Sequence, residues 1–132
     1  MDLFKLLPQT EHPHGLTDVE YDMLFTKDKP VIFNFHGYPK LVHELTYHRH
    51  NRLMHVCGYR EEGTITTPFD VRVQNNVDRF HLVRSALKRL PNLGNRGAYL
   101  FQKMNDKLVE HKQYIHDKGV DLPEVSQWKW ED

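Results

Sequence analysis

The sequence has a single cysteine, no net charge and no long apolar run, and each absence narrows what the chain can be. The lone thiol, Cys57, cannot form an internal disulfide and suits a reducing compartment, so we expect a cytoplasmic protein. Basic and acidic residues number 18 each, so no overall field draws the chain to nucleic acid or to an anionic membrane. No apolar run approaches the roughly 20 residues of a membrane-spanning helix, and residues 1–9 lack the features of a secretory signal.

The composition that remains is typical of a globular protein. Apolar residues make up 39% and charged residues 27% of the 132 residues. This length fits one modest domain, which we expect to cover residues 1–132.

The first half of the chain predicts a strand, a helix and a second strand. Residues 30–36 (PVIFNFH) and 53–59 (LMHVCGY) are β-branched and aromatic with little polar interruption, as in strands of a parallel sheet. Between them, Leu41, Val42 and Leu45 lie at helical spacing. Short connections in this order predict a βαβ unit with parallel pairing, and therefore an α/β fold with a mostly parallel sheet flanked by helices.

Two shorter elements precede this unit. Residues 2–7 are apolar and predict the end of a strand or its exit turn. Thr17 and Glu20 form the sequence signature of a capping box, which predicts a short helix from about residue 18 to residue 25.

The second half predicts a short strand followed by helices. Residues 71–75 (VRVQN) are expected as a third strand, with Asn75 or Asn76 capping the next helix. Residues 98–117 predict the longest helix, ending at Gly119. The apolar stripes of the two helices are Phe80, Val83, Leu87 and Leu90 in the first, and Leu100, Met104, Leu108, His111 and Ile115 in the second.

Histidines gather between residues 36 and 55, which raises the question of a metal site. The string HELTYH resembles the zinc motif HExxH, but His43 and His48 are five positions apart and point about 140° away from each other on a helix. We therefore expect Glu44 and His48 to form a surface ion pair instead. The basic run at residues 48–52 (HRHNR) predicts a solvated helix end, with a phosphate or nucleic-acid patch as the alternative.

Four residues are the candidates for an anion site or an interface. His36 follows a predicted strand, at the edge where open α/β sheets bind ligands, although its ring could equally be satisfied by loop carbonyls. Arg60 begins a loop that could bind phosphate, although the adjacent glutamates oppose an anion. Trp128 and Trp130 would share one face of an extended tail and pack on a parent domain or a partner. We predict no catalytic, cofactor-binding or metal-binding residue, because no motif supplies a complete constellation.

Several longer strings carry a resemblance to a known family. They are LPQTEHPHGL, VIFNFHGYP, REEGTITTPFDVRVQNNVDRFHLV, LVEHKQYI and WKW, spread over nearly the whole chain. Together they resemble the C-terminal end of phosphoketolases. The combination of FHGYP with EEGTITTPFD is far more specific than any single histidine.

The resemblance implies a lyase of carbohydrate metabolism as the parent enzyme. Phosphoketolases use thiamine diphosphate and magnesium to cleave xylulose 5-phosphate, and often fructose 6-phosphate, with phosphate. The products are acetyl phosphate and an aldose phosphate. The chemistry lies in the first two domains of a dimer, and the third domain resembles the C-terminal domain of transketolase.

This chain resembles only the later part of that third domain, with the first strand and helix missing. We therefore expect a structural or assembly role, no catalysis by this chain alone, and partners among the remaining domains or a second subunit. A parallel sheet without its first strands exposes an edge, which predicts self-association. The alternatives are a stand-alone anion-binding or regulatory module and, less favoured, a small metal-dependent hydrolase.

Overall fold

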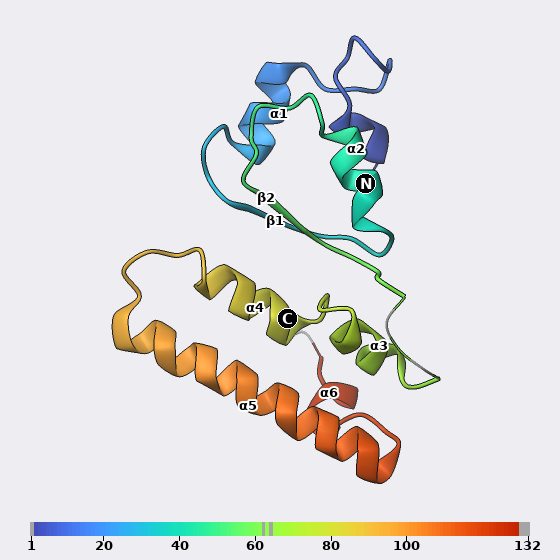
Figure 1. Ribbon diagram of the computed structural model, residues 1–132, viewed down its shortest axis with the longest axis vertical. Coiled ribbons are helices and arrows are strands. Elements are labelled where there is room, and N and C mark those ends of the chain that lie inside the picture. The colour runs from blue at the N-terminus through green and yellow to red at the C-terminus, as the bar shows by residue number, and fades with distance from the viewer. Residues whose placement is uncertain (1, 62, 64, 130–132) are drawn as a thin grey trace. The chain divides into compact units, whose positions relative to one another are not determined.

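The computed structural model describes residues 2–61, 63 and 65–129, and its contacts divide the chain into two compact units. The N-terminal unit is Met1–Arg60 and the C-terminal unit is Glu61–Asp132 (Figure 1). The elements, in chain order, are η1 (Leu3–Leu6), α1 (Asp18–Phe25), β1 (Val31–Asn34), α2 (Pro39–Leu45), β2 (Met54–Cys57), α3 (Pro68–Gln74), α4 (Arg79–Leu87), α5 (Gly94–Lys118) and α6 (Pro123–Ser126).

A two-stranded parallel sheet is the centre of the N-terminal unit. Strands β1 and β2 pair in parallel, with Val31 opposite Met54 and Asn34 opposite Cys57. Helix α2 connects them, and α1 and α2 lie on the same side of the sheet (Figure 1). The predicted βαβ unit and the α/β class are confirmed.

Three side chains from three elements form the buried core of this unit. Leu6, Tyr21 and Val42 are fully buried, and aromatic side chains including Phe25 and Phe33 pack against them. The predicted capping box of α1 is confirmed, since the Thr17 hydroxyl accepts from the Glu20 backbone N–H and the Glu20 carboxylate accepts from the Thr17 N–H.

The prediction for residues 2–7 is wrong. Leu3–Leu6 form the short 3₁₀ helix η1, which the Asp2 side chain caps by accepting from the Phe4 N–H. A side chain that caps a turn favours this helical start, and the helix places Leu6 in the core.

A loop glycine allows the two strand exits to approach each other. The Tyr59 N–H donates to the Gly37 carbonyl over 2.8 Å. A Cβ at Gly58 would lie 2.4 Å from that carbonyl oxygen and 2.8 Å from the Pro39 ring. Only glycine fits there, so the turn after β1 and the exit of β2 are held side by side.

The C-terminal unit is helical in its described residues. Helices α4 and α5 pack against each other, and α3 and α6 lie toward the C-terminal end of α5 (Figure 1). The predicted long helix is confirmed but begins earlier, at Gly94. It ends as predicted at Gly119, which has a φ of 68° and donates its N–H to the Ile115 carbonyl.

The predicted third strand is wrong, because residues 68–74 form α3. Thr67 accepts a hydrogen bond from the Asp70 N–H at the helix start, and Pro68 occupies the first turn. These N-terminal signals outweigh the β-branched composition of VRVQN. Asn75 ends α3, and Asp78 rather than either asparagine caps α4.

Across the part of the chain that is described, no helix is both long enough and apolar enough to cross a membrane.

Candidate functional site

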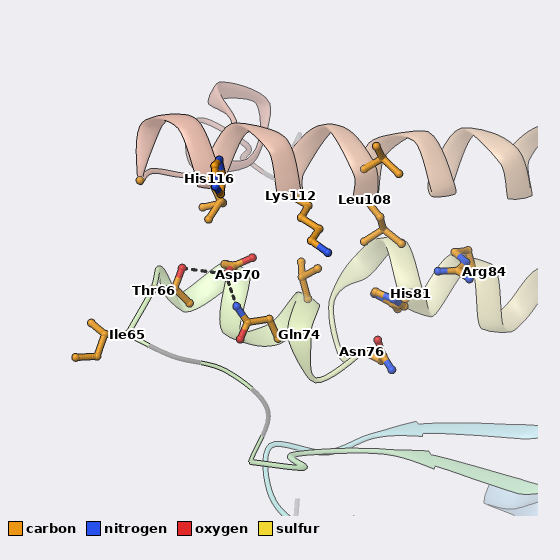
Figure 2. A pocket seen from close by; sticks show the side chains of 14 residues that line it. Ile65, Thr66, Asp70, Gln74, Asn76, His81, Arg84, Leu108, Lys112 and His116 are labelled. Atoms are coloured by element: carbon orange, nitrogen blue, oxygen red, sulfur yellow. Dashed lines mark hydrogen bonds between the residues drawn. The ribbon is translucent and has the colours of Figure 1, made fainter.

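A pocket of the C-terminal unit with a partly polar lining lies between α5 and the pair α3 and α4. Its volume is about 740 Å³, within the range of small-molecule sites, roughly 300–1,000 Å³. Figure 2 shows side chains from α3, α4 and α5 turned toward this space. The pocket is therefore the candidate functional site.

The Asp70 carboxylate lines the pocket, and both of its oxygens have hydrogen-bond partners. Asp70 is 6% exposed, and its Oδ2 accepts from the Thr66 hydroxyl at 2.9 Å and from Gln74 Nε2 at 2.7 Å (Figure 2). Its Oδ1 lies 3.2 Å from Nε2 of His111, which is fully buried. Because these partners occupy both oxygens, Asp70 orders the helices around it and has little capacity left for a ligand.

His111 cannot act as a proton-transfer group for a molecule in the pocket. Its ring is fully buried, and Nδ1 has no hydrogen-bond partner among the described residues. The ring packs edge-on against Phe69 at 5.2 Å between centroids. A general base must reach its substrate, so this Asp–His pair is structural.

A second aspartate–histidine pair lies at the start of α4. Asp78 caps the helix by accepting from the N–H groups of Phe80 and His81, and its other oxygen holds Nδ1 of His81. Asp78 is buried, whereas His81 is only partly covered and lines the pocket. Asp78 therefore fixes the direction in which His81 faces the pocket.

Two cations complete the lining. Within the described residues, Arg84 Nε is buried without a hydrogen-bond partner, and the guanidinium carbon lies 5.2 Å from the Phe101 ring centroid. Lys112 is exposed, and its side chain points from α5 into the space (Figure 2). Asp70 supplies the only carboxylate among the described lining residues, so the charge left over among them is positive.

The pocket does not suit a magnesium-bound diphosphate. Magnesium prefers several oxygen ligands, and the single carboxylate of the lining is already saturated. No cluster of three or more His, Cys, Asp or Glu side chains that could hold a metal occurs within residues 2–61, 63 and 65–129. In the N-terminal unit, His43 is exposed and His48 pairs with Glu11 at 3.5 Å.

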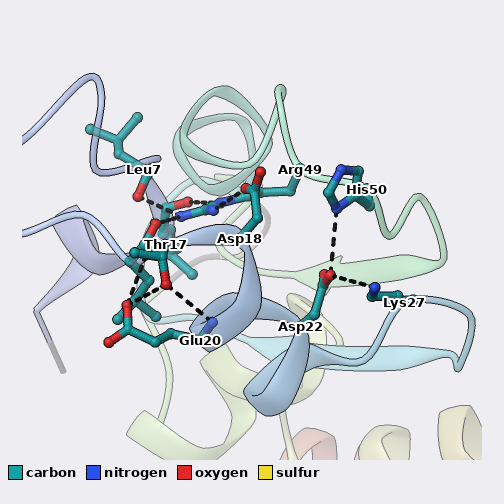
Figure 3. A network of polar contacts seen from close by, with 10 residues as sticks. Leu7, Thr17, Asp18, Glu20, Asp22, Lys27, Arg49 and His50 are labelled. Atoms are coloured by element: carbon teal, nitrogen blue, oxygen red, sulfur yellow. Dashed lines mark hydrogen bonds and ion pairs between the residues drawn. The ribbon is translucent and has the colours of Figure 1, made fainter.

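The basic run at residues 48–52 is the clearest difference between expectation and structure. The prediction of a solvated helix end is wrong for Arg49, which is 1% exposed, and for Asn51, which is 5% exposed. Arg49 donates from Nε to the Leu6 carbonyl at 2.9 Å and from Nη2 to the Leu7 and Leu16 carbonyls (Figure 3).

The third nitrogen of this guanidinium also has a partner. Nη1 lies 2.9 Å from the Asp18 carboxylate, and the guanidinium stacks on Tyr21, 4.2 Å from the ring centroid. Arg49 therefore joins η1, the loop before α1 and α1 itself, and is not available to a phosphate. Glu44 pairs with Lys40 at 3.5 Å in place of the predicted partner His48.

Three groups have pKa values that are shifted by their local contacts. Hydrogen bonds from Thr17 lower the pKa of Glu20. Burial raises the pKa of Tyr21, against the opposing charge of Arg49. Ion pairs with Glu110 and Glu124 raise the pKa of Lys107. The shifts of Glu20 and Lys107 come from surface contacts, and that of Tyr21 comes from its place in the buried core of the N-terminal unit.

The candidates from the sequence lie at two places. His36 and Arg60 are both exposed, and they occupy the two strand exits joined by the Tyr59–Gly37 hydrogen bond. Trp128 belongs to the C-terminal unit, where it is 49% exposed and Arg79 stacks 5.5 Å from its ring centroid. Trp130 lies outside the described residues.

The pocket residues were missed by sequence reasoning. Asp70, His81, Arg84 and Lys112 come from three helices, and no local motif links them. One signal was present, because His111 interrupts an otherwise apolar stripe of α5. A polar side chain at such a position requires a buried partner, and Asp70 is that partner.

Comparison with known proteins identifies the family of the chain. A family model described as the XFP C-terminal domain matches residues 1–130. A probable phosphoketolase of Clostridium acetobutylicum is 65% identical over 130 residues, covering 98% of this chain and 16% of the relative. A probable phosphoketolase of Rhodopirellula baltica is 58% identical over 131 residues, and probable phosphoketolase 2 of a Nostoc species is 55% identical over 132 residues, with the same shares of each chain covered.

The chain thus spans 16% of the length of these curated relatives. The family model, in contrast, covers this chain from residue 1 to residue 130. The chain therefore belongs to the family of XFP C-terminal domains.

Proposed function

We propose that this chain is the structural and assembly domain of a cytoplasmic, thiamine-diphosphate-dependent phosphoketolase. The parent enzyme, with magnesium, cleaves xylulose 5-phosphate or fructose 6-phosphate with inorganic phosphate to acetyl phosphate and an aldose phosphate. The observation that carries the proposal is the 65% identity to a probable phosphoketolase over 98% of this chain. This chain contributes folding and association, and the chemistry belongs to other domains.

The described residues support an assembly role. Both aspartate–histidine pairs at the pocket order the helices, and the buried Arg49 joins three segments. No lining residue of the pocket combines a free nucleophile with a base. Side chains arranged in this way stabilise a domain, and they do not form an acyl- or phosphoryl-transfer site.

The sheet provides a surface for association. Strands β1 and β2 are four residues long and pair only with each other in the described sheet, so each keeps one edge without a β partner. Short two-stranded sheets are marginal alone, and parallel sheets are normally covered. We propose that these edges bind the remaining domains of the parent enzyme or, without them, a second copy of the chain.

The experiment is a complementation assay in two steps. The purified chain is first assayed for acetyl phosphate with xylulose 5-phosphate, phosphate, thiamine diphosphate and magnesium, and we expect none. The chain is then added to the Clostridium acetobutylicum enzyme from which the matching segment has been removed. We expect binding and recovery of activity. Activity of the isolated chain, or failure to bind the shortened enzyme, would contradict the proposal and favour a stand-alone module.

A further inference from the structure

The pocket of the C-terminal unit has a charge imbalance that the assembly role does not explain. Arg84 from α4 and Lys112 from α5 both line it, and neither has an ion-pair partner among the described residues. The lining offers no uncommitted carboxylate to balance them, because Asp70 is held by three neighbours. A buried guanidinium nitrogen without a partner is costly unless an acceptor reaches it.

Arg84 and Lys112 line the pocket from two different helices, and this arrangement favours one kind of anion. A phosphomonoester carries nearly two charges at neutral pH and presents three acceptor oxygens in different directions. Such a group suits donors that come from both α4 and α5, and His81 also lines the pocket from α4. A carboxylate has one charge and two oxygens in a plane, and it matches one guanidinium better than two separate cations.

Part of the pocket lining is apolar. Val73 of α3 and Leu108 and Ile115 of α5 line it as half-buried side chains. At about 740 Å³ the space exceeds what a bare phosphate ion fills. An apolar body attached to the phosphate would cover these side chains and displace water from them.

From these observations we propose that the pocket between α3, α4 and α5 binds a small phosphomonoester with an apolar body. Arg84 and Lys112 hold the phosphate, and Leu108 and Ile115 contact the body of the ligand. Asp70 and Asp78 are positioning residues, because they order α3, α5 and His81 without needing to contact the ligand. This inference goes beyond the proposed function and does not depend on it, since binding requires only the C-terminal unit's own side chains.

The test is isothermal titration of the full chain with phenyl phosphate, benzoate and inorganic phosphate. Phenyl phosphate and benzoate share a body and differ in the anionic group, whereas inorganic phosphate lacks the body. We expect saturable one-to-one binding of phenyl phosphate, and at least about tenfold weaker binding of each of the other two probes, the loss expected for one charged hydrogen bond or one buried apolar group. Absence of saturable binding, or benzoate binding as tightly as phenyl phosphate, would overturn the proposal.

Matched variants on one helix locate the site. Lys112→Gln removes the charge at an exposed position, so the variant should fold, and phenyl phosphate should bind about tenfold more weakly. Lys103→Gln makes the same change at an exposed position of α5 that does not line the pocket, and it should leave binding unchanged. Equal loss in both variants would mean that general charge attraction, not this pocket, binds the anion.

Discussion

The two units use their basic residues in opposite ways. In the N-terminal unit, Arg49 is buried and its donors reach three backbone carbonyls and a carboxylate. In the C-terminal unit, Arg84 and Lys112 face a pocket, and neither has an ion-pair partner among the described residues. One cation is used for the fold, and the other two are left for a ligand.

The difference shows that local density of charge is a poor guide to a binding site. The run HRHNR is locally basic, yet Arg49, the first of its two arginines, is buried. The residues of the pocket are dispersed over three helices and become neighbours only in the folded chain. What decides availability is how many acceptors the fold places around each cation.

The largest effect is expected at Arg49. We predict that Arg49→Met lowers the free energy of unfolding of the N-terminal unit by roughly 2–4 kcal/mol, because the Leu6 carbonyl loses its donor in a buried position and Tyr21 loses the stacked guanidinium. The Leu7 and Leu16 carbonyls keep backbone donors, which limits the loss. Hydrogen-exchange mass spectrometry of residues 2–60 measures it.

A graded control separates burial from charge pairing. Asp18 is the ion-pair partner of Arg49, but its side chain is 59% exposed. Asp18→Ala should therefore cost only about 0.5–1 kcal/mol. If both substitutions cost the same, the ion pair rather than the buried carbonyl contacts would carry the stability.

The next effect is expected in the C-terminal unit at Asp70. We predict that Asp70→Ala destabilises it by roughly 2 kcal/mol, because the fully buried His111 and the Gln74 amide lose their acceptor. Faster hydrogen exchange in residues 65–118 would report this. Asp106→Ala removes an exposed carboxylate from α5 and should have little effect; an equal loss there would contradict a special role for Asp70.

A smaller effect is expected at the start of α1. Thr17→Ala removes the capping box and should lower the free energy of unfolding by about 1 kcal/mol at neutral pH.

The same variant should change the pH dependence of stability. The pKa of Glu20 is lowered in the folded chain, so the stability that Glu20 contributes is present above the ordinary value of 4.5 and is lost as the pH falls through the folded pKa. Acid titration followed by circular dichroism should therefore show a weaker pH dependence in Thr17→Ala below about pH 4.5. An unchanged dependence would exclude the Thr17–Glu20 contacts as its source.

The smallest effect on stability is expected at Lys112. We predict that Lys112→Gln changes the free energy of unfolding by less than about 0.5 kcal/mol, because the side chain is exposed and has no ion-pair partner among the described residues. Urea denaturation measures the change. A loss as large as that of Asp70→Ala would mean that Lys112 stabilises the fold, and the contrast between the two units would fail.

Much of the fold could be predicted from local patterns. The apolar runs around Val31 and Met54 predicted parallel strands, and the Thr17–Glu20 pair predicted the start of α1. These succeeded because the signal and the structure involve neighbours in sequence. The strand prediction for residues 71–75 failed because it rested on β-branched composition alone. Thr67 and Pro68 provide a helix start just before these residues, and that signal favours a helix.

The candidate site could not be predicted in the same way. His36 and Arg60 were predicted as anion-binding candidates because they follow the predicted strands. The structure brings the two segments together, and the anion-binding role of both residues stays a prediction. Asp70 and His111 are 41 positions apart and meet only when α3 packs near α5. No spacing rule links residues across such a distance, so the pocket required the tertiary structure.

The most direct test of the account is an exchange in the Clostridium acetobutylicum enzyme, followed by the rate of acetyl phosphate formation. The segment of that enzyme that matches this chain is removed, replaced by this chain, or replaced by this chain with Arg49→Met. We predict that the replaced enzyme is folded and active, that the shortened enzyme loses activity, and that Arg49→Met restores little of it. A shortened enzyme as active as the parent would contradict the claim that this chain serves as the assembly domain of a phosphoketolase.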